Sequence, residues 1–222
     1  MIPLRDERRQ GPFPWVTATI VVLLAIIYLW DRNWHLLGPR YVFADMAARP
    51  VDIMAVFKGG LKEPLVTLFT SIFLHANLQH IIANVLFLWV FGPRVEQRFG
   101  PWRFMLFYLF FGVFAAATQI FVMPNSGVPL LSASGAIAGV MGSYLILYPS
   151  AEIEAVVPPF FWIPFDVPAW LMLGLWFLFQ IFYAQPGVAN WAHAGGFLAG
   201  MLVVFLTKSS RRPRASSPLG LA

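Results

Sequence analysis

The chain has 222 residues, of which 59% are hydrophobic and 11% are charged. Soluble domains carry roughly 25% charged residues, and the mean hydropathy of this chain is +0.71. The composition therefore argues against a soluble domain and for a protein whose solvent is lipid. The absence of cysteine excludes disulfides, cysteine-ligated metal and a cysteine nucleophile.

Six apolar segments approach the length of about 20 residues that a helix needs to cross the hydrocarbon core. The first is not followed by a small-residue cleavage pattern, so it indicates an anchor rather than a signal peptide. Several are short, but a short helix is accommodated by bilayer thinning or by burial among neighbours. We predict an all-α integral membrane protein with one domain over residues 13–207 and helices near 13–30, 78–91, 102–123, 134–148, 168–183 and 191–206.

The basic residues predict the orientation, because cytoplasmic segments are enriched in Lys and Arg. With six spans, the tail 1–12, the second connection and the tail 208–222 all lie on one side of the membrane. These segments hold ten of the fifteen basic residues: Arg5, Arg8, Arg9, Arg94, Arg98, Arg103, Lys208, Arg211, Arg212 and Arg214. Both termini are therefore predicted to be cytoplasmic. The tail 208–222 is rich in Ser, Pro and Arg, a composition typical of disorder.

The first external loop, 31–77, is long enough to need structure of its own. It contains two apolar pieces, Val51–Phe57 and Leu65–Leu74, and neither is long enough to span the membrane. We interpret both as interfacial or partly inserted helices. A solvated linker is the alternative, and the apolar composition fits it poorly.

Polar residues inside a membrane helix are costly and usually face the bundle interior. Here they open the second, fourth and sixth predicted helices, which all run in the same direction and so bring the three clusters to a similar depth. The clusters are His75, Asn77, Gln79, His80 and Asn84; Ser132, Ser134 and Gly135; and Asn190 and His193.

Small residues then predict which helices touch, because membrane helices approach through them. The fourth helix has Gly135 and Gly139 four residues apart, and the sixth has Ala192, Gly196 and Gly200 at the same spacing. Residues four apart share one helix face. Packing of the two strips brings Ser134 and His193 within reach of each other. The alternative is that the glycines serve packing alone, as in many transporters.

His80 and Asn84 are also four apart, and Asn77 precedes them as a predicted helix cap. Both side chains can donate hydrogen bonds, which is what a negative oxygen forming near Ser134 would require. A structural histidine or a proton path is the alternative for His80.

These residues resemble the rhomboid intramembrane serine proteases over roughly residues 65–205. The family has Gly-x-Ser-Gly on its fourth helix, His-x-x-x-Asn on the second and Ala-His followed by glycines on the sixth. The matching segments are Ser132-Ala133-Ser134-Gly135-Ala136-Ile137, His80-Ile81-Ile82-Ala83-Asn84 and Ala192-His193-Ala194-Gly195-Gly196. Further matches are His75 and Glu96-Gln97-Arg98-Phe99-Gly100, which is similar to the family's Glu-x-Arg-x-Gly turn after the second helix.

The chain departs from the family pattern at three places. Ser132 stands at the first motif glycine, Ala138 at a place that is often aromatic, and Val66-Thr67 at the place of a Trp-Arg pair. All three concern the surroundings of the site. The serine and the histidine are present, which argues against an inactive relative.

The resemblance implies that Ser134 is the nucleophile and His193 the general base and acid. No acidic residue lies near His193 in the sequence, so we expect a dyad without an aspartate. His80, Asn84 and the Ser134 backbone N–H would form the oxyanion site. The fifth helix and the loop Ala184–Asn190 would form a lateral gate and cap.

The implied partners are transmembrane protein substrates and the lipid bilayer, with no nucleic acid, cofactor or metal, and the oligomeric state stays open. A six-span core with short tails suits a bacterial inner membrane.

Other classes make different predictions. A transporter or channel would carry polar residues through the membrane midplane, whereas here they stop in the outer part. A rhomboid-like protein that only binds membrane clients would lack Ser134 or His193. A soluble α/β-hydrolase would need glycines where this chain has Ser132 and Ala136.

Overall fold

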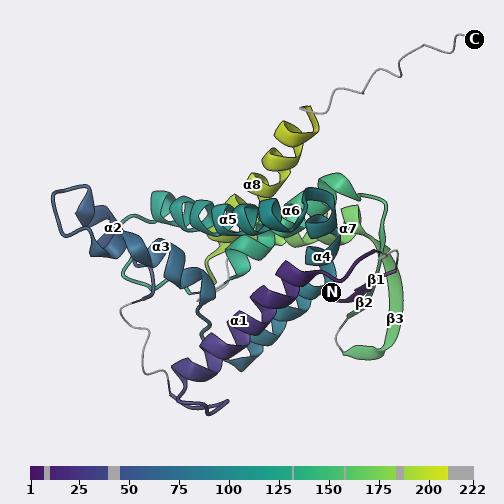
Figure 1. The fold of residues 1–222 in the computed structure, drawn as a ribbon, viewed down its shortest axis with the longest axis horizontal. Helices are drawn as coiled ribbons and strands as arrows, with labels where there is room; N and C mark the ends of the chain where they lie inside the picture. The colour runs from purple at the N-terminus through teal and green to yellow at the C-terminus, as the bar shows by residue number, and fades with distance from the viewer. Residues whose placement is uncertain (8–10, 40–45, 132, 158, 184–187, 210–222) are drawn as a thin grey trace, which may run out of the picture.

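A computed structural model describes residues 1–7, 11–39, 46–131, 133–157, 159–183 and 188–209. The fold is predominantly helical (Figure 1). Each of the six predicted apolar segments is a helix. The bounds are α1 Trp15–Asp31, α4 Leu78–Phe99, α5 Pro101–Val122, α6 Ser134–Leu147, α7 Ala169–Phe182 and α8 Asn190–Ser209.

Three of these helices are long and apolar enough to cross a membrane by length and composition, namely α4, α5 and residues Asn190–Thr207 of α8. The helices α1, α6 and α7 are apolar but shorter, with 17, 14 and 14 residues. The predicted tail 208–222 lies outside the described residues apart from 208 and 209, which continue α8.

Helix α4 extends beyond the predicted end at Phe91 and passes through Pro93 before it stops at Phe99. The segment Glu96–Gly100 was therefore wrongly predicted as a turn after the helix. Its first four residues form the last turn of α4, and the helix ends at Gly100, whose φ of +83° favours glycine. Glu96 of this turn is buried and accepts hydrogen bonds from the backbone N–H groups of Val16 and Thr17 at the start of α1.

The first loop contains short helices, as its apolar pieces predicted, so its described part is not an unstructured linker. The elements are α2 Pro50–Val56, η1 Glu63–Val66, α3 Thr67–Thr70 and η2 Ser71–Phe73. In Figure 1, α2 and α3 lie at one end of the molecule, and they contact α5. Ile72 of η2 reaches α5 at Gly112, where a Cβ would collide with its side chain.

The prediction of an all-α fold is wrong in one respect. A small antiparallel sheet lies at the end of the molecule opposite to α2 and α3 (Figure 1). Its order is β1 Ile2–Asp6, β2 Glu152–Val157 and β3 Phe160–Pro168. The predicted N-terminal tail thus supplies a strand. A strand of five residues whose partner lies some 150 residues away has no local sequence signal.

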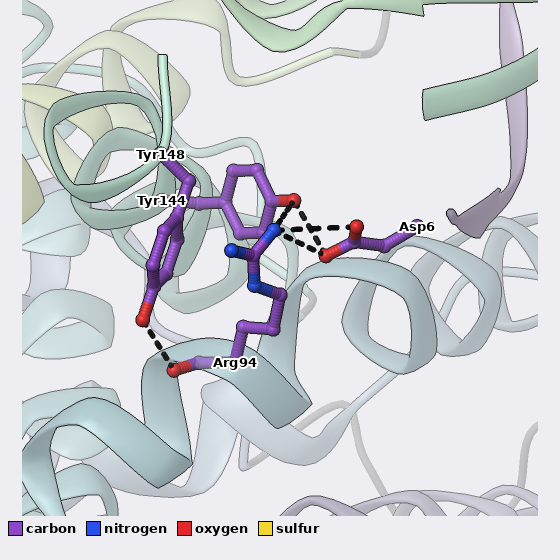
Figure 2. A network of polar contacts seen from close by, with 4 residues as sticks. All are labelled: Asp6, Arg94, Tyr144 and Tyr148. Atoms are coloured by element: carbon purple, nitrogen blue, oxygen red, sulfur yellow. Dashed lines mark hydrogen bonds and ion pairs between the residues drawn. The ribbon is translucent and has the colours of Figure 1, made fainter. Parts of the chain in front are cut away.

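A buried polar network ties this sheet to the helices (Figure 2). The Asp6 carboxylate at the end of β1 accepts hydrogen bonds from Tyr144 Oη of α6 at 2.6 Å and from Arg94 Nη1 of α4 at 3.1 Å. The Arg94 guanidinium also lies over the Tyr148 ring at 3.8 Å from its centroid. This network fixes the end of α6 opposite to Ser134.

Helix α6 occupies the centre of the bundle, with every residue from Gly135 to Tyr144 buried. Its closest partner is α8. A Cβ at Gly196 would collide with the Gly135 carbonyl oxygen, and a Cβ at Gly200 with that of Gly139. The predicted packing of the two glycine strips is confirmed.

Candidate active site

Ser134 and His193 lie at the facing starts of two packed helices. Ser134 is the first residue of α6, and His193 lies in the first turn of α8. The close approach of the glycine strips places Ser134 Oγ 2.7 Å from His193 Nε2, within hydrogen-bonding distance. A hydroxyl in this contact can transfer its proton to a neutral imidazole.

The other ring nitrogen of His193 also has a partner, which the sequence analysis missed. His193 Nδ1 lies 2.7 Å from Gln180 Oε1. Gln180 belongs to α7, and its one signal in the sequence was that it is the sole amide or charged side chain in the segment 168–183. Spacing along the chain could not indicate that it would meet His193.

The start of α8 is held by two further polar residues. Asn190 Nδ2 donates to the backbone oxygens of Gln180 and Tyr183 at 3.2 and 3.1 Å, which joins α8 to the end of α7. The Ala192 N–H donates to Oε1 of buried Gln119 on α5 at 3.1 Å. Neither Gln119 nor its contact was predicted. Together these bonds fix the backbone on which His193 stands.

The predicted oxyanion donors lie on α4, which packs against α6. Asn77 caps α4 as predicted, since its side chain accepts a bond of 2.9 Å from the His80 N–H. Asn84 is buried and His80 is half-buried. Among the described residues, His80 is the titratable side chain of α4 near His193.

His75 lies beside this site in the loop that precedes α4. Its ring packs edge to face on His80 with centroids 5.5 Å apart, and neither ring nitrogen has a hydrogen-bond partner among the described residues. Burial, together with the nearby His80 and Arg32, lowers the pKa of His75 from 6.5 to about 3. The ring is therefore neutral at physiological pH.

The three departures from the family pattern fall in different surroundings. Ala138 is fully buried in α6. Val66 is exposed at the end of η1, and the Thr67 hydroxyl donates to the Pro64 oxygen at 2.6 Å. Ser132 lies outside the described residues, as does the 184–187 part of the predicted cap loop.

Within the described part of the chain, no aspartate or glutamate contacts His193, whose ring partners are Ser134 and Gln180. That part also holds no group of three or more His, Cys, Asp or Glu side chains that could bind a metal ion. The site therefore contains a hydrogen-bonded chain of three side chains: the Ser134 hydroxyl, the His193 imidazole and the Gln180 amide.

Comparison with known proteins assigns the chain to a family. The model of the Rhomboid domain matches residues 62–210. RHOMBOID-like protein 1 of Arabidopsis thaliana is 30% identical over 87% of this chain and 53% of its own length. RHOMBOID-like protein 12, mitochondrial, of the same plant is 33% identical over 63% of this chain and 45% of its own length.

A bacterial relative matches over more of this chain. Rhomboid protease GlpG of Salmonella newport is 26% identical over 94% of this chain and 67% of its own length. The chain spans about half the length of the plant relatives that it matches. With the apolar helices described above, these matches establish an integral membrane protein. The chain belongs to the rhomboid family.

Proposed function

We propose that the chain is an intramembrane serine endopeptidase that cleaves transmembrane segments of other membrane proteins with Ser134 and His193. The observation that carries this proposal is the contact of 2.7 Å between Ser134 Oγ and His193 Nε2. A serine is a weak nucleophile on its own and needs an adjacent base. Membership of the rhomboid family and the similarity to a protein named rhomboid protease support the assignment.

In the proposed mechanism, Ser134 Oγ attacks the scissile carbonyl carbon while its proton moves to His193 Nε2. The tetrahedral intermediate then collapses, the C–N bond breaks, and His193 gives the proton to the leaving amine. Water attacks the resulting acyl-enzyme, with His193 again accepting the proton. The second tetrahedral intermediate then collapses and its bond to Ser134 Oγ breaks. His193 returns the proton to Ser134 Oγ, and the second product leaves.

The negative oxygen of the intermediate would be stabilised at the start of α6. The N-cap position, Ala133, has no side-chain cap bond, and a helix start carries a partial positive charge. His80 and Asn84 from α4 would add side-chain donors. Removal of one such donor typically costs about 10²-fold to 10³-fold in rate.

We further propose that all six apolar helices cross the bilayer, with both termini in the cytoplasm of a bacterium and the chain in its inner membrane. Helix α6 has 14 residues, which correspond to about 21 Å. A hydrocarbon core is about 30 Å thick. Because α6 is buried among its neighbours, it need not reach the surface at its start, which supports the proposal that Ser134 lies at membrane depth.

Helix α7 is the proposed side of substrate entry. It contributes three buried residues, Ala169, Met172 and Leu173, all in its first turns. Its second half exposes Leu178, Phe179 and Phe182. A helix with so little buried surface at the end nearest His193 can move aside to admit a transmembrane segment.

Co-reconstitution in liposomes tests this function. The purified chain is combined with a panel of single-span model proteins, and cleavage sites are mapped by mass spectrometry. We expect products cut in or near the spanning segment with the wild type, and none with Ser134→Ala or His193→Ala. Equal cleavage by the wild type and Ser134→Ala would reject the proposal.

A further inference from the structure

We propose that Gln180 is a positioning residue that holds His193 in the tautomer able to accept the proton of Ser134. This inference rests on the proposed function. It starts from the fact that the two ring nitrogens of His193 contact different helices. Nε2 lies 2.7 Å from Ser134 Oγ on α6, and Nδ1 lies 2.7 Å from Gln180 Oε1 on α7.

A neutral imidazole carries one N–H, and the partner of one nitrogen decides the role of the other. An amide oxygen can only accept a hydrogen bond. Its position against Nδ1 therefore places the ring proton on Nδ1 and leaves the lone pair on Nε2, facing the Ser134 hydroxyl. The opposite tautomer would donate from Nε2 to Oγ and could not act as a base.

A second, longer contact agrees with this orientation of the Gln180 amide. Its Nε2 donates to the Trp176 backbone oxygen at 3.5 Å, one helical turn earlier. A flipped amide would set its oxygen against that carbonyl oxygen and its NH₂ toward Nδ1. The contact with Trp176 thus favours the orientation that presents Oε1 to His193.

Two further contacts join this part of α7 to α8. Asn190 Nδ2 donates to the Gln180 backbone oxygen at 3.2 Å, and the Trp176 ring packs on the His193 ring with centroids 5.7 Å apart. Gln180 and Trp176 of α7 therefore both contact the imidazole, and Asn190 joins the start of α8 to the α7 backbone. The base is aligned when α7 is packed against α8, and movement of α7 would release it.

Glutamine suits this role because it stays neutral. It cannot take the Nδ1 proton, and its oxygen continues to accept from Nδ1–H when His193 becomes an imidazolium. Of the elements packed around His193, α5, α6 and α7 present Gln119, Ser134 and Gln180, none of which titrates near neutral pH. Among the described residues, the titratable side chain that α4 brings toward this ring is His80.

The test measures the second-order rate of reaction with a fluorophosphonate probe, from acid to alkaline pH, in detergent-solubilised full-length protein. Gln180→Leu removes the acceptor, and we expect labelling to slow at least about tenfold, as for loss of a group that orients a histidine. Phe205→Leu alters an exposed residue near the end of α8 that is far from His193 and should label as the wild type does. Thermal unfolding shows whether each variant is folded.

Gln180→Glu supplies the readout that a purely structural role would not move. Its carboxylate keeps an acceptor at Nδ1 and favours the imidazolium, so the acid limb of the pH–rate profile should shift to higher pH while labelling above that limb is retained. This arm decides the question if Gln180→Leu fails to fold. Wild-type labelling by Gln180→Leu, or an unshifted profile for Gln180→Glu, would overturn the inference.

Failure of the proposed function is distinguishable from failure of this inference. If the wild type labels and Ser134→Ala does not, the nucleophile stands whatever the Gln180 variants do. If the wild type does not label, or labels at a residue other than Ser134, both proposals are overturned.

Discussion

The hydroxyl of Thr17 donates a hydrogen bond of 2.7 Å to the Glu96 carboxylate, which joins the start of α1 to the end of α4. The same carboxylate accepts from the backbone N–H groups of Val16 and Thr17 at 3.0 and 2.8 Å. A helix start has orphan N–H groups and a partial positive charge, and a buried carboxylate satisfies both. Glu96 therefore acts as a tertiary cap of α1.

Replacement of Glu96 by alanine is predicted to destabilise the protein. It leaves buried donors on Thr17 without an acceptor, which costs about 1–3 kcal/mol for each unsatisfied group. The measurement is the thermal unfolding midpoint in detergent. Glu63→Ala, at an exposed site, is the matched control and should leave the midpoint unchanged. Equal midpoints for Glu96→Ala and the control would refute the capping role.

Removal of Asp6 is predicted to loosen the sheet from the bundle. The Asp6 side chain is fully buried against Arg94 (Figure 2), and loss of one partner of a buried ion pair costs about 3–5 kcal/mol. Tyr144→Phe removes one bond to the charged group and should cost about 1.5–3 kcal/mol. Arg5→Ala, which removes a side chain that is itself exposed, serves as control. A midpoint for Asp6→Ala that matches Arg5→Ala would contradict this account.

A methyl group at Gly200 is predicted to separate α6 from α8. The Cβ would collide with the Gly139 carbonyl oxygen, which is backbone and cannot move aside cheaply. We expect Gly200→Ala to lower both the unfolding midpoint and the labelling of Ser134. Gly174→Ala in α7 is the matched control, because nothing lies within 4 Å of its Cβ position. That control should gain up to about 1 kcal/mol of helix propensity, and an equal loss in both variants would exclude the packing explanation.

Buried His75 predicts a loss of stability in mild acid. Its pKa is about 3 in the folded chain and 6.5 ordinarily, so the unfolded state binds its proton first as the pH falls. The stabilisation present above pH 6.5 is lost at about 1.4 kcal/mol per pH unit between these two values.

This predicts that His75→Leu is less acid-sensitive than the wild type. At about pH 5 the wild type should have lost about 2 kcal/mol through this group alone, and the variant should keep that part. The readout is the shift of the unfolding midpoint when the pH is lowered from about 7.5 to about 5. His35→Leu at an exposed position is the control. Parallel shifts in the wild type and His75→Leu would show that His75 does not titrate on unfolding.

Much of the fold could be predicted because each apolar segment carries its own signal. The six helices, the helical first loop and the Asn77 cap all follow from local hydropathy and residue type. The approach of α6 and α8 could be predicted as well. Gly139 and Gly200 lie in strips of small residues, which let the two helix backbones come close together. These strips bring Ser134 and His193 into contact.

The features that were missed depend on contacts between distant segments. Strand β1 pairs with β2 across most of the chain, and its charged residues suggested a tail. The end of α4 was misplaced because Pro93 and three charged residues resemble a helix stop, and their buried partners Asp6 and Thr17 lie far away in sequence. Gln180 was overlooked because the rotation of α7 about its axis is set by packing, which no spacing within α7 reveals.

Mass-spectrometric mapping of the fluorophosphonate adduct in the wild type, Ser134→Ala and His193→Ala shows whether Ser134 is a nucleophile activated by His193. We expect one adduct per wild-type chain, on Ser134, with none in Ser134→Ala and strongly slowed formation in His193→Ala. An adduct on another residue, or formation at the wild-type rate without His193, would contradict this expectation.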